Sequence, residues 1–217
     1  LLAVTILGAA LRLYGIGGQP PLTDEVLTAY SAENYVERGC CGATIGYHPN
    51  LRNILVYASM KAFGKGAFGL RGFSLLFGTL GIPILGLLIH RITRNETASL
   101  LAAFFLAIDP VHITFSRQAI QEVHTAFFFL LGTLLTVLAY PPASTVGKED
   151  DKAFWLLPLA GVSFGFGIAS KAHALFPLVV CMFYVVYVCE KGKLAWSDRA
   201  FGLLSLTLLP LAVYMLT

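Results

Sequence analysis

Charged residues are what this sequence has least of. Asp, Glu, Lys and Arg together make up 12% of its 217 residues, whereas a soluble domain usually carries about 25%. This scarcity excludes a water-soluble globular protein. A hydrophobic share of 57% and a mean hydropathy of +0.74 instead indicate an integral, multi-pass membrane protein. The formal net charge is only +3, and because no basic patch is present we expect no nucleic-acid partner.

Cysteine is rare as well, and its placement excludes a thiolate metal centre. Only four cysteines occur. Cys40 and Cys41 are adjacent, where a disulfide would be strained, and Cys181 and Cys189 fall within one apolar run. None of them has the spacing of a metal site. Cysteine therefore says little about function.

Apolar runs are what the sequence has instead, and they predict membrane-spanning helices. Several are at or just below the roughly 20 residues that a helical span needs. The first begins without Met or a charged flank, and the last continues to the final residue, so we interpret the chain as an internal piece of a longer protein. A signal peptide is the alternative for the first run, but no small-residue cleavage site follows it. The seven runs are 1–16, 70–90, 97–113, 123–140, 154–170, 172–189 and 201–217.

Lys and Arg are distributed unevenly among the loops, which predicts the orientation. After the second span, three loops that are rich in Lys and Arg alternate with loops that are poorer in them, and the rich loops should be cytoplasmic. Segment 17–69 then faces outward, and its stretches 23–38 and 51–63 are typical of helices lying in the membrane interface. A short span is the alternative for 51–63. The basic loops contain Arg91 and Arg94; Lys148 and Lys152; and Lys191, Lys193 and Arg199.

A pair of carboxylates, Asp24 and Glu25, follows the first apolar run where the chain would leave the membrane. Acids at this boundary suggest chemistry on something that the lipid brings there. The alternative is a helix cap, with Thr23 or Asp24 capping a surface helix and Glu25 in its first turn. The local sequence favours the cap. Further along the same segment, His48 precedes a proline and is either a turn residue or a titratable group or metal ligand.

Two further stretches place ionisable groups close to the hydrocarbon. Segment 109–124 contains Asp109, His112, Arg117, Glu122 and His124 between two apolar runs. These groups are either functional, or form an interfacial turn in which Arg117 pairs with Asp109 or Glu122. Lys171 lies between the fifth and sixth apolar runs. Its side chain either extends to the membrane interface or meets a phosphate group at the outer leaflet.

These groups converge on one side of the predicted bundle. Carboxylates that face cations suit transfer of a group from a lipid-linked phosphate, because an acid takes the acceptor's proton while the cations stabilise the departing phosphate. A transporter is disfavoured, since the charges gather at one face and not at the bilayer midplane.

The ordered set of motifs resembles the GT-C membrane glycosyltransferases. The resemblance is to the dolichyl-phosphate-mannose protein mannosyltransferases and the bacterial aminoarabinose transferases in particular, and it covers nearly the whole chain. Its motifs are Asp24-Glu25, His48-Pro49, the stretch 70–80 that includes Arg71, Asp109-Pro110-Val111-His112, Ser116-Arg117-Gln118-Ala119 with Glu122, and the glycine-rich run that ends at Lys171.

The resemblance implies an all-α, GT-C-like membrane helical bundle of about seven transmembrane helices plus interfacial juxtamembrane helices. Residues 1–217 would be the N-terminal part of that domain, with 17–69 as an extracytoplasmic loop. Asp24 would be the general base, with Glu25 and Glu122 as further acidic catalytic residues. Lys171, Arg117 and Arg71 would bind the donor phosphate, and His48 and His124 are other candidates. Some relatives use a divalent cation, so the cofactor stays open.

Two features depart from the family pattern. The family commonly has His-Pro-Pro where this chain has His48-Pro49-Asn50, and it carries further spans and often an outer soluble domain. We expect a glycosyltransferase that moves a hexosyl or pentosyl group from a polyprenyl-phosphate donor to a protein, lipid or glycan. Its partners would be the lipid-linked sugar phosphate, membrane lipid and subunits of a membrane complex. The alternative is a non-catalytic scaffold subunit. We expect a bacterial or archaeal plasma membrane in preference to the endoplasmic reticulum.

Overall fold

The computed structural model of the chain describes residues 1–18, 20–38, 50–142, 153–192 and 194–217. Every regular element within these ranges is helical. Two short 3-10 turns, η1 (Ile16–Gly18) and η3 (Ala172–Ala174), accompany the α-helices. The α-helices are α1 (Leu2–Leu13), α2 (Thr23–Arg38), α3 (Leu51–Phe63), α4 (Ala67–Thr93), α5 (Glu96–Ile108), α6 (Pro110–Ser116), α7 (Gln121–Ala139), α8 (Leu156–Ser170), α9 (Leu175–Lys191) and α10 (Trp196–Leu216).

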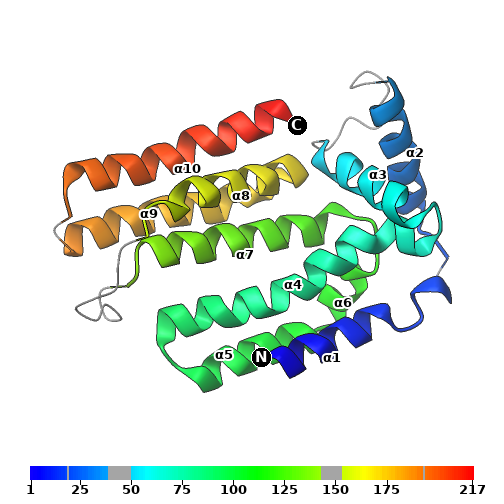
Figure 1. Cartoon of the computed structure of the whole chain (residues 1–217), viewed down its shortest axis with the longest axis horizontal. Helices are drawn as coiled ribbons and strands as arrows, with labels where there is room; N and C mark the ends of the chain where they lie inside the picture. Colours follow the sequence, from blue (N-terminus) through cyan, green and yellow to red (C-terminus); the bar gives the residue numbers. More distant parts are fainter. Residues whose placement is uncertain (19, 39–49, 143–152, 193) are drawn as a thin grey trace.

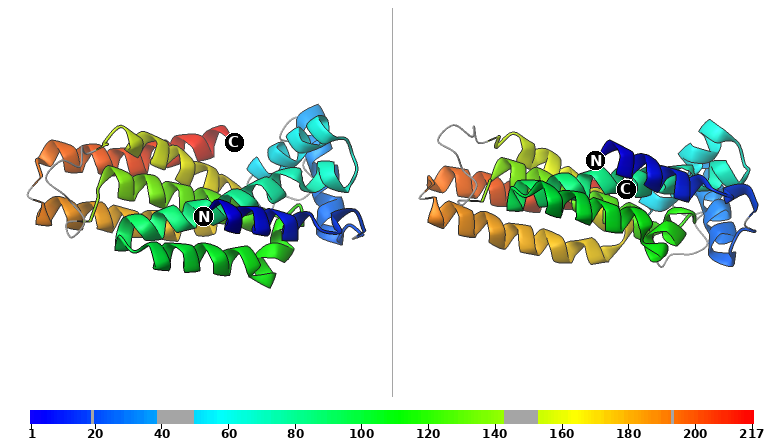
Figure 2. Two further views of the ribbon diagram at one scale, coloured as in Figure 1. Left: turned by 60° about the horizontal axis from the view of Figure 1, so that its bottom comes forward. Right: turned by 90° about the horizontal axis from the view of Figure 1, so that it is seen from below.

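The long helices lie side by side and alternate in direction (Figure 1). α4 packs against α7, α7 against α8 and α8 against α10, while α1 and α5 cover the other side of α4. α2 and α3 lie together across one end of this bundle, and they stay at that end in both other views (Figure 2). α1, α5 and α8 end there, while α4, α7 and α9 begin there. Segments that are distant in sequence therefore meet at this end.

The expected all-α membrane bundle is confirmed, and most of each predicted apolar run is helical. By length and composition, four helical stretches of the described chain could cross a membrane: α4, α7, residues 172–191 and α10. Two bent helix pairs would raise the number to six, and α8, at 15 residues, is a shorter apolar helix. The number of about seven spans stays a prediction.

The two helices predicted for the membrane interface are present with the predicted bounds. α2 covers Thr23–Arg38 and α3 covers Leu51–Phe63. Segments 2–18 and 23–34 meet at 88°, so α2 crosses the end of the bundle and does not continue α1. α3 is not among the stretches that could cross a membrane alone. Both helices therefore serve to close the end of the bundle where α4 and α7 begin.

The third apolar run is not one continuous helix, contrary to the prediction for 97–113. α5 ends at Ile108, and α6 begins at Pro110 after a bend of 60°. Proline lacks the N–H that would continue the α5 hydrogen-bond ladder, and its fixed φ suits the first turn of a new helix. Asp109 caps α6, because its carboxylate accepts the N–H of Val111 at 2.9 Å. We call this bend the α5–α6 elbow.

α4 and α6 cross closely just below the elbow. Gly78 of α4 makes this possible, because a Cβ at that position would overlap Ser116 Oγ and lie 2.6 Å from Ser116 Cβ. Ser116 is the last residue of α6 and is fully buried. The close crossing leads the chain from α6 directly toward the start of α7.

Candidate functional site

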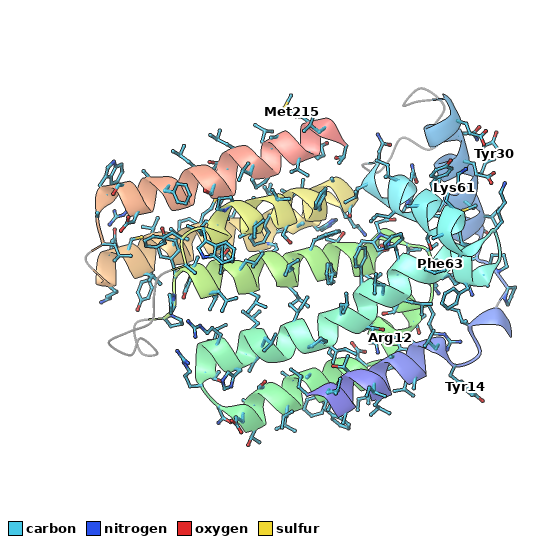
Figure 3. All side chains as sticks on the ribbon, in the orientation of Figure 1. Arg12, Tyr14, Tyr30, Lys61, Phe63 and Met215 are labelled. Atoms are coloured by element: carbon cyan, nitrogen blue, oxygen red, sulfur yellow. The ribbon has the colours of Figure 1, made fainter. Side chains whose placement is uncertain are left out.

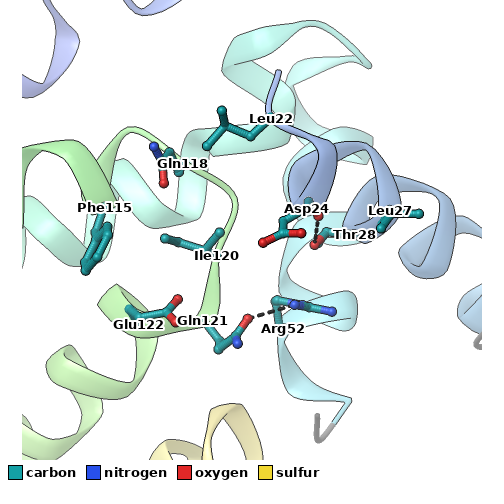
Figure 4. A pocket seen from close by; sticks show the side chains of 10 residues that line it. All are labelled: Leu22, Asp24, Leu27, Thr28, Arg52, Phe115, Gln118, Ile120, Gln121 and Glu122. Atoms are coloured by element: carbon teal, nitrogen blue, oxygen red, sulfur yellow. Dashed lines mark hydrogen bonds between the residues drawn. The ribbon is translucent and has the colours of Figure 1, made fainter. Parts of the chain in front are cut away.

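A pocket of about 360 Å³ opens between α2, α3 and the α6–α7 connection (Figure 4). It is the point where α2 and α3 meet the loops of the bundle. Three of its side chains are ionisable, and they come from three different helices: Asp24 from α2, Arg52 from α3 and Glu122 from α7. The lining residues are Leu22, Asp24, Leu27, Thr28, Arg52, Phe115, Gln118, Ile120, Gln121 and Glu122.

Asp24 lies in the first turn of α2, and its side chain is drawn among the pocket residues (Figure 4). A carboxylate in the first turn interacts favourably with the positive end of the helix dipole, so this position suits a charged acid. Asp24 is exposed, and its backbone carbonyl accepts the hydroxyl of Thr28 at 2.6 Å. Its carboxylate is therefore held by a regular helix and stays accessible to a bound molecule.

The neighbouring acid, Glu25, lies in entirely different surroundings. It is 0% exposed and pairs with Arg71 of α4, which is 2% exposed. One carboxylate oxygen accepts Arg71 Nε and the other accepts Arg71 Nη2, each at 2.7 Å. Glu25 also accepts the N–H of Leu22 at 3.0 Å and the N–H of Ala119 at 2.9 Å. Arg71 in turn donates to the carbonyls of Ile16 and Pro20.

This arrangement changes the roles that the sequence suggested for both residues. Glu25 was expected to act on substrate and Arg71 to bind phosphate, but neither lines the pocket, and each satisfies the other inside the protein. The bond from Leu22 N–H is the reach-back half of a capping box, so the cap contact at the start of α2 comes from Glu25 and not from the expected Thr23 or Asp24, which lie inside the helix. The pair ties α2, α4 and the connection before α7 together, and thereby positions Asp24.

The pKa of Glu25 reflects this balance. Burial by itself would raise the pKa. The hydrogen bonds from Arg71, together with those from the backbone N–H groups of Leu22 and Ala119 and the charge of Arg71, outweigh burial, so the pKa lies below its ordinary value. Glu25 is therefore held as a carboxylate, which suits a structural ion pair and does not suit a group that must take up a proton.

Arg52 is the pocket residue that the sequence analysis missed. It is 8% exposed, and its Nη1 donates to Gln121 Oε1 at 2.7 Å. Its Nε is buried and has no hydrogen-bond partner among the described residues. Burial lowers the pKa of Arg52, and the nearby charges of Glu122 and Asp24 partly offset this effect. The available signal was an arginine in the first turn of a helix that was predicted to lie in the membrane interface, next to the His48-Pro49 motif.

Glu122 and Lys171 form an ion pair with an N–O distance of 2.8 Å, and their side chains are 32% and 27% exposed. Glu122 also lines a second pocket of about 350 Å³ beside α7 and the start of α9. Apart from this pair, that second pocket is lined mainly by apolar side chains, including Ala126, Phe129 and Pro177. The ion pair therefore lies between a polar pocket and a mainly apolar one.

The remaining predicted site residues lie elsewhere. Arg117 does not line the pocket, and its Nε is buried without a hydrogen-bond partner in the described ranges. Its two proposed acidic partners are engaged otherwise, since Asp109 caps α6 and Glu122 pairs with Lys171. His124 is fully buried inside the bundle, where Nε2 lies 3.1 Å from Ser74 Oγ. His48 falls outside the described residues.

The part of the chain that the structure describes contains no preformed metal-binding site. No three His, Cys, Asp or Glu side chains gather there in a way that could hold one. Asp24 and Glu122 are the two carboxylates that share the pocket.

Comparison with protein families and curated proteins gives two matches. A family model described as dolichyl-phosphate-mannose-protein mannosyltransferase matches residues 39–217. A curated relative, dolichyl-phosphate-mannose–protein mannosyltransferase 1 of Schizosaccharomyces pombe, is 29% identical over 112 residues. That alignment covers 51% of this chain and 12% of the relative, so the chain spans only a small part of the relative's length.

Comparison with solved structures supports the fold. The protein O-mannosyltransferase Pmt1-Pmt2 complex of S. cerevisiae, bound to the sugar donor, contains a chain that matches with a TM-score of 0.81 at 19% identity. The match covers 99% of this chain and 32% of that chain. Both relatives are yeast proteins, so they do not support the preference for a bacterial or archaeal membrane.

Proposed function

This chain belongs to the dolichyl-phosphate-mannose-protein mannosyltransferase family, and on that premise we propose that its pocket is part of a glycosyl-transfer site. The donor would be a polyprenyl-phosphate-linked sugar, in the first instance a mannose, and the acceptor a hydroxyl group of a protein. One observation carries the proposal: Asp24, Arg52 and Glu122, from three different helices, line one pocket at the end of a membrane bundle.

Asp24 is the proposed general base. The acceptor hydroxyl gives its proton to the Asp24 carboxylate as the acceptor oxygen forms a bond to the anomeric carbon of the sugar. The bond between that carbon and the phosphate oxygen breaks, and its electron pair stays on the departing lipid phosphate. Attack opposite the leaving phosphate inverts the configuration at the anomeric carbon. Asp24 suits this role because its carboxylate is exposed, whereas Glu25 is buried and paired.

Arg52 and Lys171 are the proposed cations for the donor phosphate. Negative charge grows on the phosphate oxygen as the bond to the sugar breaks, and a positioned cation stabilises it most where water is excluded. The Nε–H of Arg52 is buried and has no hydrogen-bond partner among the described residues, so it could donate to a phosphate oxygen. Lys171 would exchange Glu122 for the phosphate, since both members of that pair are partly exposed. Arg71 is committed to Glu25 and is not part of this set.

The second pocket is the proposed binding site for the lipid part of the donor. It is lined mainly by apolar side chains and shares Glu122 with the polar pocket. A polyprenyl phosphate would then place its chain beside α7 and α9 and its sugar beside Asp24. We further propose that this end of the bundle is extracytoplasmic. Arg91 lies in the last turn of α4 and Arg94 directly follows that helix, so both lie at its opposite end, as the positive-inside rule requires of a cytoplasmic face.

The test is a transfer assay on the full-length protein that contains this chain, in membranes, with dolichyl-phosphate-mannose as donor and a hydroxyl-containing peptide as acceptor. Asp24→Asn should lower kcat by about 10²–10⁴-fold while the protein still inserts, because the carboxamide keeps the size of the side chain and loses the base. Asp198→Asn, at the opposite end of the bundle, is the matched control and should keep the parental rate.

An undiminished rate for Asp24→Asn would remove the assignment of the base. The scaffold alternative makes a different prediction. A parental protein that transfers no sugar, but purifies with a partner subunit in fixed ratio, would support a non-catalytic role for this member of the family.

A further inference from the structure

Arg12 is a fully buried arginine in the last turn of the otherwise apolar α1. It points from α1 toward the bundle, whereas the nearby Tyr14 lies at the outer surface (Figure 3). An arginine within an apolar segment is costly and needs partners for its N–H groups. The guanidinium finds them on both sides of the α5–α6 elbow, about one hundred residues further along the chain.

Among the carbonyl groups at the end of α5 that lack their helical donors at the elbow are those of Leu106 and Ala107. The carbonyl of Leu106 would normally accept the N–H four residues later, but that residue is Pro110, which has none. The carbonyl of Ala107 would accept the N–H of Val111, which donates to the Asp109 carboxylate instead. Arg12 fills both positions: Nη2 donates to Leu106 O and Nη1 to Ala107 O, each at 3.1 Å.

The same guanidinium also holds α6. Nη2 lies 2.7 Å from His112 Nδ1 in the first turn, and Nε donates to Ser116 Oγ at 3.2 Å at the end of the helix. Ser116 donates in turn to the carbonyl of His112 at 2.6 Å. One side chain therefore binds the end of α5 and both ends of α6 at once, which only a planar group with five donors can do.

The position of α6 matters for the pocket. Phe115 and the residues that follow α6 form one wall of it, and the next helix begins there with Gln121 and Glu122. Within that connection, the N–H of Ala119 donates to Glu25. A shift of α6 would therefore move the wall that carries Glu122 relative to Asp24.

We propose that Arg12 is a positioning residue for this pocket, acting by replacing the helical hydrogen bonds that the Asp109-Pro110 bend removes and so fixing the angle of the α5–α6 elbow. Its effect on transfer rests on the proposed function, whereas its effect on the elbow does not. A lysine at this position would keep the charge but could not reach the partners on both sides of the bend.

The test uses Arg12→Lys and Arg12→Met in the full-length protein, with Arg94→Lys at the opposite end of α4 as the matched control. Hydrogen exchange of segment 106–121 is measured beside the kcat/KM of transfer. Both Arg12 variants should raise exchange in that segment by about tenfold or more, because each loses charge-assisted hydrogen bonds. Both should lower kcat/KM by a similar factor, while the control changes neither.

A second background tests the mechanism itself. Pro110→Ala restores a backbone N–H that can donate to the carbonyl of Leu106. Arg12→Lys should therefore raise hydrogen exchange in segment 106–121 clearly less in the Pro110→Ala background than in the parental protein. Equal losses in both backgrounds would overturn the link to the bend, as would parental exchange and parental kcat/KM for Arg12→Lys. Should Arg12→Met fail to accumulate, Arg12→Lys alone decides. Raised exchange in a protein that transfers no sugar would uphold the elbow and refute the proposed function instead.

Discussion

Replacing Glu25 by glutamine is the most direct test of the buried junction beneath the pocket. The carboxylate accepts four hydrogen bonds, two from Arg71 and one each from the N–H groups of Leu22 and Ala119. A carboxamide has one acceptor oxygen and one donor group, so the donors that met the lost oxygen would face another donor. Glu25→Gln would also leave the charge of Arg71 buried without its counter-ion.

The expected size follows from this geometry. Removing one partner of a buried ion pair costs about 3–5 kcal/mol, because the other charge remains buried and uncompensated. Glu25 is 0% exposed and Arg71 is 2% exposed, so solvent cannot screen the remaining charge. We expect Glu25→Gln to lower the free energy of unfolding by about 3 kcal/mol or more. This is a change of about a hundredfold in the folding equilibrium.

The assay is chemical unfolding of the purified full-length protein in detergent micelles, arranged as a double-mutant cycle. The variants are Glu25→Gln, Arg71→Met and the two combined. The double variant should lose clearly less than the sum of the single variants, since no isolated charge remains. Glu190→Gln removes an exposed carboxylate that lies 3.7 Å from the partly exposed Arg199, and it should cost less than about 1 kcal/mol. Additive losses, or a loss for Glu25→Gln as small as that of the control, would refute the reasoning.

Three further predictions concern pH, packing and the donor. The pKa of Glu25 is lowered in the folded protein. Its contribution to stability is therefore present above the ordinary pKa of about 4.3 and is lost as the pH falls through the lower pKa of the folded protein. The denaturant concentration at the unfolding midpoint should drop over that pH range, and it should drop less in Glu25→Gln. Gly78→Ala should cost about 1–3 kcal/mol by overpacking the crossing of α4 and α6. Gly81→Ala, whose Cβ would have its nearest neighbour at 4.0 Å, should cost nothing in the same unfolding assay. Lys171→Met should cost less than about 1 kcal/mol of stability, since Lys171 and Glu122 are both partly exposed. The same substitution should raise the KM for the lipid-linked donor by about tenfold. An unchanged KM would remove Lys171 from the donor site.

Much of the fold could be predicted from the sequence, because in a membrane the polarity of each segment dictates its structure. A backbone in hydrocarbon must satisfy its own hydrogen bonds, so a long apolar run can only be helical or part of a closed barrel. The run starting at residue 70 therefore became α4, and the bounds of the amphipathic stretches 23–38 and 51–63 were predicted correctly. The alternation of spans also brought Asp24 and Glu122 to the same end of the bundle, and both line the same pocket.

The sequence by itself thus determined an all-α membrane bundle with acids and bases gathered at one end, because helix formation and membrane insertion depend on local polarity. Only the tertiary structure decided how those groups are paired. Glu25 and Arg71 are 46 residues apart, and Arg12 meets the elbow 94 to 104 residues away. Asp24 and Glu25 are adjacent in the chain and equally acidic, yet one faces the pocket and the other is buried. Which of two neighbouring carboxylates meets an arginine depends on how α2 lies against α4, and that packing depends on contacts between distant helices.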